Sequence, residues 1–379
     1  MIYNKQIKSL ELSAIRKLNK LADKETINLG IGRPFCQTPE VIKNAGIEAI
    51  ENNKTYYTNN LGIKKLRHAI STRYQLGNFK NSLVTLGAAE AIYLAIKTLT
   101  NYDDEVLIPN PGYLAYEPIC KMVGLKAKSY CLNNKHKINF DKLKKLITSK
   151  TKMIIINHPG NPTGVSFNKE ELQELIKICI DNNIYLISDE SYIGINFSSE
   201  KLYSVADLSL EKNIISICSL SKEYSMTGWR LGWIYTNSEN IKQLVKPHLF
   251  INSCATTISQ YAGLKAIEDN PREVVEKLEI NKNIMKSYLD AMENISYIKS
   301  NSGLYFFIDV SYYGDDKKLA KKILEDINVL TIYGSAFGKN GKGYLRLSFG
   351  PRPNKIKKGM KKLTNYFNNL ERKQHEIQY

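Results

Sequence analysis

The sequence of 379 residues is 43% hydrophobic, which excludes a disordered chain and, because the length exceeds that of a usual domain, predicts two domains. Its formal charge of +17 is spread along the chain without an arginine-rich tract or zinc-finger spacing, so we interpret it as general cationic character and not as a nucleic-acid surface. The six cysteines form no Cys-x-x-Cys pair, residues 1–21 lack an apolar leader, and no run of about 18 apolar residues occurs, so we expect a cytoplasmic protein with neither membrane nor nucleic-acid partners.

The first forty residues are predicted to form an arm and not a domain. A short amphipathic helix is favoured by the apolar residues Ile7, Leu10, Ile15, Leu18 and Leu21. Residues 27–39 contain two glycines and two prolines, and we interpret them as an irregular loop. We expect residues 1–40 to pack with a small carboxyl-terminal domain.

Helices are predicted next, over residues 41–52 and 63–74, with an exposed Tyr56-Tyr57 pair between them. From residue 83, short apolar runs alternate with helical patterns, which is typical of a mostly parallel sheet covered by helices on both faces. The expected strands span residues 83–86, 105–108, 126–132, 152–157, 184–188, 214–218 and 231–236. Ligands of such sheets bind outside the carboxyl ends of the strands.

A long connecting helix is predicted from just after Pro271 to about Met292. The remainder mixes strands and helices and ends in an amphipathic helix with its lysines on the solvent-exposed face. The expected elements are a strand over 304–310, a helix over 317–327 and strands over 329–332 and 344–349. We therefore predict an α/β fold, with a large domain at residues 41–272 and a smaller α+β domain at residues 273–379.

Two strand ends carry candidate binding groups. Ala88 and Ala89 follow Gly87 at the start of a predicted helix, where free amides and the helix dipole favour an anion such as a phosphate. The alternative is a turn of small residues selected for tight packing. After the strand over 152–157, the turn-rich segment over 158–164 would fix the side chain of Asn161.

Two further strand ends carry ionisable groups. Asp189 follows the strand over 184–188, with Tyr192 three residues on, and a carboxylate in that place needs a cationic partner. The strand over 214–218 is followed by two hydroxyls, an amine and a guanidinium suited to bidentate phosphate binding, from Ser219, Ser221, Lys222 and Arg230. Most lysines are solvated surface charges. Burial or a neighbouring cation would instead make Lys222 a nucleophile toward an aldehyde.

Taken together, these strand ends suit an aldehyde-bearing pyridinium phosphate. Such a cofactor needs a lysine for covalent attachment, a carboxylate that keeps its ring nitrogen protonated, donors near its phenolic oxygen and a phosphate cradle. The sequence offers all four at successive strand ends and no metal-ligand spacing. We therefore expect pyridoxal 5'-phosphate as the cofactor and no metal.

The motifs resemble those of the fold-type I pyridoxal-phosphate enzymes, specifically the class I/II aminotransferases, over nearly the whole length. In that family the lysine of S-x-S-K-x(7)-R, here Lys222, carries the cofactor covalently, and the aspartate of D-E-x-Y, here Asp189, pairs with the pyridine nitrogen. The resemblance implies that Asn161 and Tyr192 hydrogen-bond the phenolic oxygen. It also implies phosphate ligands at Ala88, Ala89, Ser219, Ser221 and Arg230.

The resemblance extends to the substrate side and to a second subunit. Tyr113 matches the aromatic residue that stacks on the ring, although a packed core tyrosine is its ordinary alternative. Tyr57 resembles the tyrosine that reaches the phosphate of the neighbouring subunit, which implies a homodimer with shared active sites. Arg346 matches the residue that binds the substrate α-carboxylate, and Gly32 and Asn161 are implied beside it.

The implied function is a PLP-dependent amino acid aminotransferase, which moves an α-amino group between an amino acid and a 2-oxo acid by a ping-pong Schiff-base mechanism. A β-lyase, cyclase or oxidase would keep the same cofactor residues and remains an alternative. A DNA-binding regulator would need a helix-turn-helix segment for which residues 1–21 are too short. The donor and acceptor stay open. Arg33 is the candidate for an acidic side chain, and Phe35, Cys36 and Tyr333 depart from the family pattern nearby.

Overall fold

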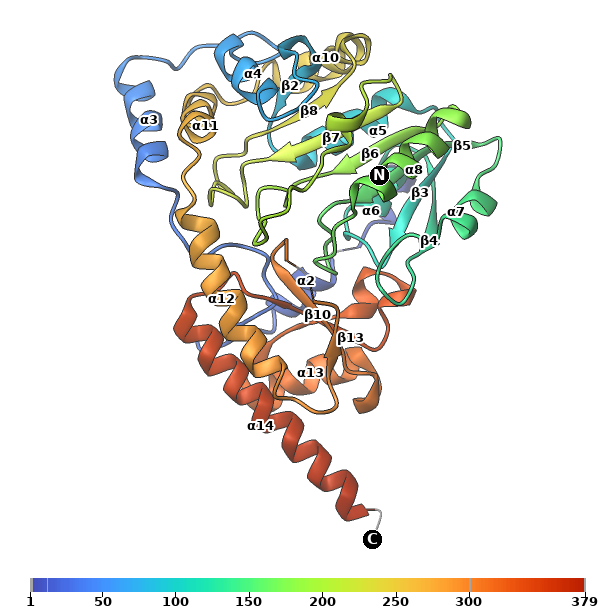
Figure 1. Ribbon diagram of the computed structural model, residues 1–379, viewed down its shortest axis with the longest axis vertical. Helices are drawn as coiled ribbons and strands as arrows, with labels where there is room; N and C mark the ends of the chain where they lie inside the picture. Colours follow the sequence, from blue (N-terminus) through green and yellow to red (C-terminus); the bar gives the residue numbers. More distant parts are fainter. Residues whose placement is uncertain (1–2, 12, 300, 378–379) are drawn as a thin grey trace.

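The computed structural model describes residues 3–11, 13–299 and 301–377, and its largest element is a seven-stranded sheet (Figure 1). The strand order is β2-β8-β7-β6-β5-β3-β4, and only β8 runs antiparallel to its neighbours. The prediction of a mostly parallel sheet is therefore confirmed. Its strands are β2 (Ser82–Thr85), β3 (Glu105–Asn110), β4 (Lys126–Cys131), β5 (Thr151–Asn157), β6 (Tyr185–Asp189), β7 (Ile214–Ser219) and β8 (Gly232–Thr236).

Alternating side chains along the strands bury both faces of this sheet. In β5, Met153 and Ile155 join a core with residues of α5, α6 and α10, whereas Ile154 and Ile156 join a core with residues of α7, α8 and α9. Helices α3, α4 and α11 pack around the β2–β8 edge. These helices are α3 (Glu40–Glu51), α4 (Lys64–Ser71), α5 (Ala88–Leu99), α6 (Tyr116–Met122), α7 (Phe140–Leu146), α8 (Lys169–Asp181), α9 (Val205–Leu208), α10 (Ser238–Asn252) and α11 (Thr257–Asp269).

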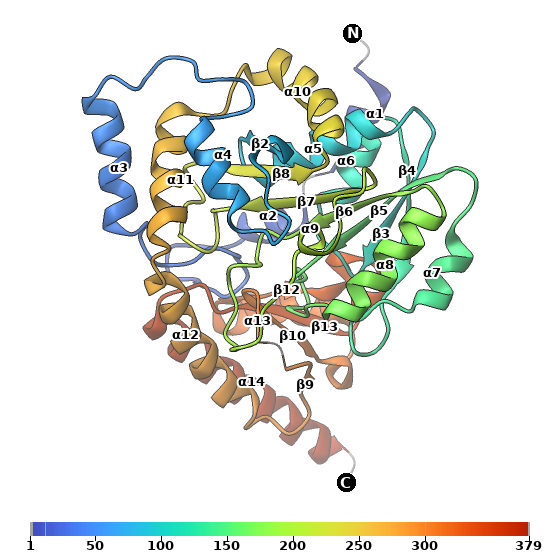
Figure 2. The same ribbon diagram turned by 45° about the horizontal axis from the view of Figure 1, so that its top comes forward.

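A smaller antiparallel sheet follows the helix predicted beyond Pro271, which is α12 (Glu273–Leu289). Its order is β12-β13-β10-β9, with β9 (Ser296–Tyr297), β10 (Tyr305–Asp309), β12 (Ile332–Tyr333) and β13 (Tyr344–Ser348). Helix α13 (Asp316–Ile327) packs on this sheet, and α14 (Pro353–Ile377) runs beside α12 in both views (Figures 1 and 2). Apolar residues of α12, α14 and β10 share one core.

Three local predictions were wrong. The helix expected between Ile7 and Leu21 is two short helices, α1 (Lys5–Lys8) beside α6 and α2 (Ala14–Asn19), because the side chains of Asn4 and Ser13 each cap a new helix start (Figure 2). The strand expected over 329–332 is divided between two sheets: β11 (Val329–Leu330) pairs with β1 (Ile27–Asn28), and β12 pairs with β13. The segment expected to be a loop over 27–39 therefore begins with a strand.

The described part of the chain contains no helix that is both long and apolar enough to cross a membrane.

Candidate active site

A cavity of about 270 Å³ lies at the carboxyl ends of the parallel strands. Strands β6 and β7 each run one residue further than predicted, so that Asp189 and Ser219 are their last residues. Every predicted cofactor or substrate residue except Tyr57 and Arg33 lines this cavity: Gly32, Ala88, Ala89, Tyr113, Asn161, Asp189, Tyr192, Ser219, Ser221, Lys222, Arg230 and Arg346.

Lys222 lies in the turn that follows β7, and its Nζ donates a hydrogen bond to the carbonyl oxygen of Gly32 at 2.6 Å. Burial is the main cause that lowers the pKa of this amine to about 8. Neighbouring cations lower it further, whereas the charge of Asp189 acts in the opposite direction; the cations are Arg346, Arg230 and Arg33. A substantial fraction of the amine is therefore neutral near physiological pH, as a nucleophile requires.

The carboxylate of Asp189 is buried and is held by hydroxyl and amide donors. Its Oδ1 accepts from the Oγ and N–H of Ser191 at 2.6 and 3.2 Å, and its Oδ2 accepts from the hydroxyl of Tyr116 at 2.8 Å. Burial raises the pKa of Asp189, while these hydrogen bonds and the charge of Lys222 lower it. A protonated pyridine nitrogen would supply the cation that this carboxylate needs, so the residues fit the cofactor.

The start of α5 and the residues after β7 offer donors for a phosphate to this cavity. Ala88 and Ala89 begin α5, and the preceding Gly87 has a φ of +86°, a conformation that side chains rarely adopt. A Cβ at Gly87 would lie 3.0 Å from Nη2 of Arg230, so glycine also leaves room for the guanidinium. The Oγ of Ser219 donates to the Oγ of Ser221 at 2.8 Å. Hydroxyls, a guanidinium and a helix N-terminus together suit a phosphate dianion.

Arg346 extends from β13 to the side of the cavity near the amino-terminal arm. Its Nη1 donates to Oδ1 of Asn161 at 2.8 Å, and its Nη2 donates to the carbonyl oxygen of Gly30. The guanidinium lies between two aromatic rings, 4.3 Å from the centre of Tyr305 and 4.8 Å from that of Phe337. Its Nε is buried and has no hydrogen-bond partner among the described residues.

Several residues of the cavity were not predicted. Tyr305, on β10, shares a hydrogen bond of 2.8 Å between its hydroxyl and that of Tyr192. A Cβ at Gly32 would overlap the hydroxyl of Tyr305, at 1.8 Å, so this loop position requires glycine. Tyr116 was not predicted either; it lies behind the lining, at the start of α6, and packs edge-to-face on Tyr113 with ring centres 5.4 Å apart. Nothing in the local sequence marks Tyr305 or Tyr116 as a site residue.

Tyr57 and Arg33 lie outside the lining of the cavity. Tyr57 is 81% exposed. Arg33 is exposed next to Gly32, close enough to Lys222 for its charge to lower the pKa of that amine. Among the described residues, no group of three or more histidine, cysteine or acidic side chains could hold a metal ion.

Comparison with known proteins agrees with this geometry. The model of the family "Aminotransferase class I and II" matches residues 24–363. A probable aspartate aminotransferase of Methanocaldococcus jannaschii is 37% identical over 93% of this chain and 96% of its own length. An aromatic-amino-acid aminotransferase of Thermococcus litoralis is 30% identical over 96% and 97%.

Solved structures give the same result. An aspartate aminotransferase of Thermotoga maritima superposes with a TM-score of 0.90 and 28% identity, over 97% of this chain and 100% of that one. An aromatic aminotransferase of Pyrococcus horikoshii superposes with a TM-score of 0.87 and 30% identity, over 94% and 99%. The chain therefore belongs to the aminotransferase class I and II family, and it is a pyridoxal-phosphate-dependent amino acid aminotransferase.

Proposed function

We propose that the side chains around the cavity divide the work of transamination as the motifs imply. Lys222 holds the cofactor and moves the proton, Asp189 faces the ring nitrogen, and Tyr113 packs on the ring. Asn161 and Tyr192 face the phenolic oxygen. The phosphate is held by Ala88, Ala89, Ser219, Ser221 and Arg230. The observation that carries this proposal is the convergence of these groups on one cavity around an amine whose pKa is lowered to about 8.

Pyridoxal phosphate, when bound, supplies an aldehyde that condenses with amines and an electron-poor ring that stabilises negative charge at the substrate α-carbon. Lys222 would hold this aldehyde through its Nζ, and the Nζ, once free, would accept the proton that the substrate α-carbon loses. The same Nζ would then donate that proton, so a single base would serve both transfers. Asp189 would pair with the ring nitrogen and favour its protonated form.

Arg346 orients the substrate in this proposal. Its guanidinium presents a fork to the α-carboxylate, and its Nε, which is buried without a partner in the described chain, is the donor still to be satisfied. The aromatic rings of Tyr305 and Phe337 stack near the planar guanidinium and shield it from water. The α-carbon is thereby directed toward Lys222.

We infer that the preferred amino donor is a dicarboxylic amino acid and that Arg33 binds its distal carboxylate. Curated relatives named aspartate aminotransferases support this choice, as does the place of Arg33 beside Gly32, near enough to influence Lys222. A half-reaction screen of the twenty amino acids, followed by loss of the absorbance of the bound cofactor, tests it. Aspartate or glutamate should react fastest, and a fastest reaction with an aromatic or branched donor would reject the assignment.

Replacing Arg33 by glutamine should raise the KM for aspartate by up to about fivefold, because an exposed charge pair is lost and the distal carboxylate is left without a partner. The KM for phenylalanine should not change, since its side chain carries no charge. Steady-state kinetics with both donors measure the difference. Equal effects on the two donors would show that Arg33 does not recognise the side chain of the substrate.

We propose that the protein is a homodimer in which Tyr57 reaches the phosphate site of the partner subunit. Thr257 donates its hydroxyl to the carbonyl oxygen of Tyr56 at 2.8 Å, so the loop with Tyr57 lies against the start of α11. The last turn of the adjacent α10 carries exposed apolar side chains, among them Phe250, which is 87% exposed. Exposed apolar surface of this kind marks a protein interface.

Replacing Tyr57 by phenylalanine should weaken binding of the cofactor about tenfold, because one hydrogen bond to a charged phosphate is lost. The control is phenylalanine at Tyr56, which has the same chemistry one residue away. Equilibrium ultrafiltration of the holoenzyme measures cofactor affinity, and analytical ultracentrifugation measures the oligomeric state. A monomeric wild-type protein, or an unchanged affinity in the Tyr57 variant, would contradict the shared site.

We also infer a cytoplasmic location. All six cysteines are free, and Cys120, Cys179 and Cys218 are buried, as expected in a reducing compartment. Cell fractionation with an activity assay checks the inference, and recovery of the activity outside the cytoplasmic fraction would reject it.

A further inference from the structure

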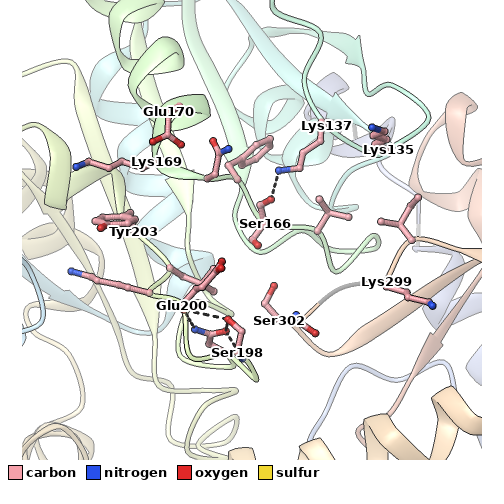
Figure 3. A pocket seen from close by; sticks show the side chains of 18 residues that line it. Lys135, Lys137, Ser166, Lys169, Glu170, Ser198, Glu200, Tyr203, Lys299 and Ser302 are labelled. Atoms are coloured by element: carbon pink, nitrogen blue, oxygen red, sulfur yellow. Dashed lines mark hydrogen bonds between the residues drawn. The ribbon is translucent and has the colours of Figure 1, made fainter.

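A second and larger cavity, of about 860 Å³, lies outside the active site and shares no lining residue with it (Figure 3). Its walls come from segments within residues 135–137, 165–170 and 196–203 on the side of the large sheet, and from Ile298, Lys299, Asn301 and Ser302 beside β9. We call it the basic groove, after its five lysines: Lys135, Lys137, Lys169, Lys201 and Lys299. Its volume falls in the range of about 300–1,000 Å³ that small-molecule sites occupy.

The groove carries more positive charge than its own acids neutralise. Glu170 and Glu200 are the acidic residues in its lining. Two of the lysines have acidic partners: Nζ of Lys137 lies 2.6 Å from Glu171, and Nζ of Lys201 lies 3.2 Å from Asp207. Within residues 3–11, 13–299 and 301–377, the other three lysines have no ion pair; they are Lys135, Lys169 and Lys299.

Aromatic rings hold several of these ammonium groups in place. The Nζ atoms of Lys169 and Lys201 lie 5.5 and 5.2 Å from the centre of the Tyr203 ring. That of Lys137 lies 5.4 Å from the Phe167 ring and donates to the carbonyl oxygen of Ser166. Cation–π contacts of this kind limit the freedom of side chains that are otherwise mobile. A ligand that binds them has less conformational entropy to overcome.

The unpaired lysines lie on opposite sides of the groove. Figure 3 shows Lys169 with Tyr203 on one side and Lys135 and Lys299 on the other, with the hollow between them. A ligand with a single anionic group would engage one side and leave the other unpaired. A ligand with separated anionic groups would engage both.

We propose that the basic groove binds a small polyanion with two or more phosphate or carboxylate groups, which bridges Lys169 on one wall and Lys135 and Lys299 on the other. Phosphate suits these partners because a lysine ammonium binds it as a point charge without the planar fork of arginine. The phosphate site proposed for the cofactor is separate, since Arg230 lines the other cavity.

The test is isothermal titration calorimetry of the holoenzyme with inorganic tripolyphosphate at low ionic strength. One site per chain should appear, and its affinity should fall as salt is added, because exposed charge contacts are screened. Replacing Lys135, Lys169 and Lys299 together by glutamine should weaken binding about tenfold or more, since each exposed charge contact contributes up to about fivefold. Transamination by this variant should be retained.

The matched control replaces three exposed lysines of α13 and α14, Lys317, Lys322 and Lys358, by glutamine. It has the same net charge as the groove variant and should bind tripolyphosphate as the wild type does. Citrate and tripolyphosphate are compared on the wild type: tighter binding of one identifies carboxylates or phosphates as the preferred groups, and both results support the site.

Three outcomes would overturn the proposal. The first is an equal loss of affinity in the groove variant and the control variant, which would show that binding depends on the net charge of the protein and not on the groove. The second is binding of inorganic phosphate as tight as that of tripolyphosphate, which would remove the bridge between the walls. The third is binding of an oligonucleotide by a protein that binds neither small anion.

Discussion

Replacing Lys222 by alanine should lower the rate of transamination by at least about a thousandfold, because the variant loses both the covalent attachment of the cofactor and the base that moves the α-proton. The absorbance of covalently held cofactor should disappear at the same time. Steady-state assays with an amino acid and a 2-oxo acid measure the first effect, and spectra of the purified protein measure the second.

A second lysine provides the control for this prediction. Lys282 is also buried, at 8% exposure, and its pKa is also lowered by burial, but it lies on α12 away from the cavity. Alanine at Lys282 should retain the cofactor absorbance and the rate per folded molecule, with thermal melts used to correct for stability. Full transamination by the Lys222 variant would reject the assignment of the reacting amine.

The active-site cavity contains more cationic than acidic side chains, which indicates that its ligands are anionic. Lys222, Arg230 and Arg346 line it with Asp189 as their single acidic counterpart among the described residues. Grouping cations in this way is costly unless anions enter. A phosphate dianion and a substrate carboxylate would supply the anions. Burial first, and the neighbouring arginines second, lower the pKa of Lys222.

The large sheet could be predicted because its signals are local. Seven short apolar runs gave seven strands, and the groups that follow the parallel strands met at one edge because parallel strands bring their carboxyl ends together. The predicted site residues of the large sheet needed only this rule to be placed in one cavity, whereas Gly32 on the arm and Arg346 on β13 were predicted from the family resemblance. The division into an arm and two domains stays a prediction.

The remaining features depend on contacts between distant residues. β1 pairs with β11 some three hundred residues later. Each of these strands is only two residues long, which is too short to show a periodic pattern in the sequence. Tyr305 enters the cavity because β10 pairs with β13, which places it beside Arg346. Within β10, Tyr305 occupies an inward-facing position like that of any buried core tyrosine. No local sequence pattern therefore distinguishes it as a site residue.

Replacing Arg346 by alanine should raise the KM for amino acid substrates by about 30-fold or more, because a charge-assisted contact to the α-carboxylate is worth about 2 to 5 kcal/mol when it is desolvated. Lysine at this position keeps the charge but loses the fork, and it should recover part of the affinity. Steady-state kinetics of the wild type and both variants measure the series.

A structural role of Arg346 gives a different result. The guanidinium also donates to the Asn161 side chain and lies close to the rings of Tyr305 and Phe337, so a purely structural effect of alanine would slow every substrate alike. A primary amine without a carboxylate separates the two roles, because it has nothing for Arg346 to bind. Its half-reaction should be equally slow in the wild type and the alanine variant. If the variant slows this amine as much as it slows the amino acid, or if the KM for the amino acid does not change, Arg346 does not bind the carboxylate.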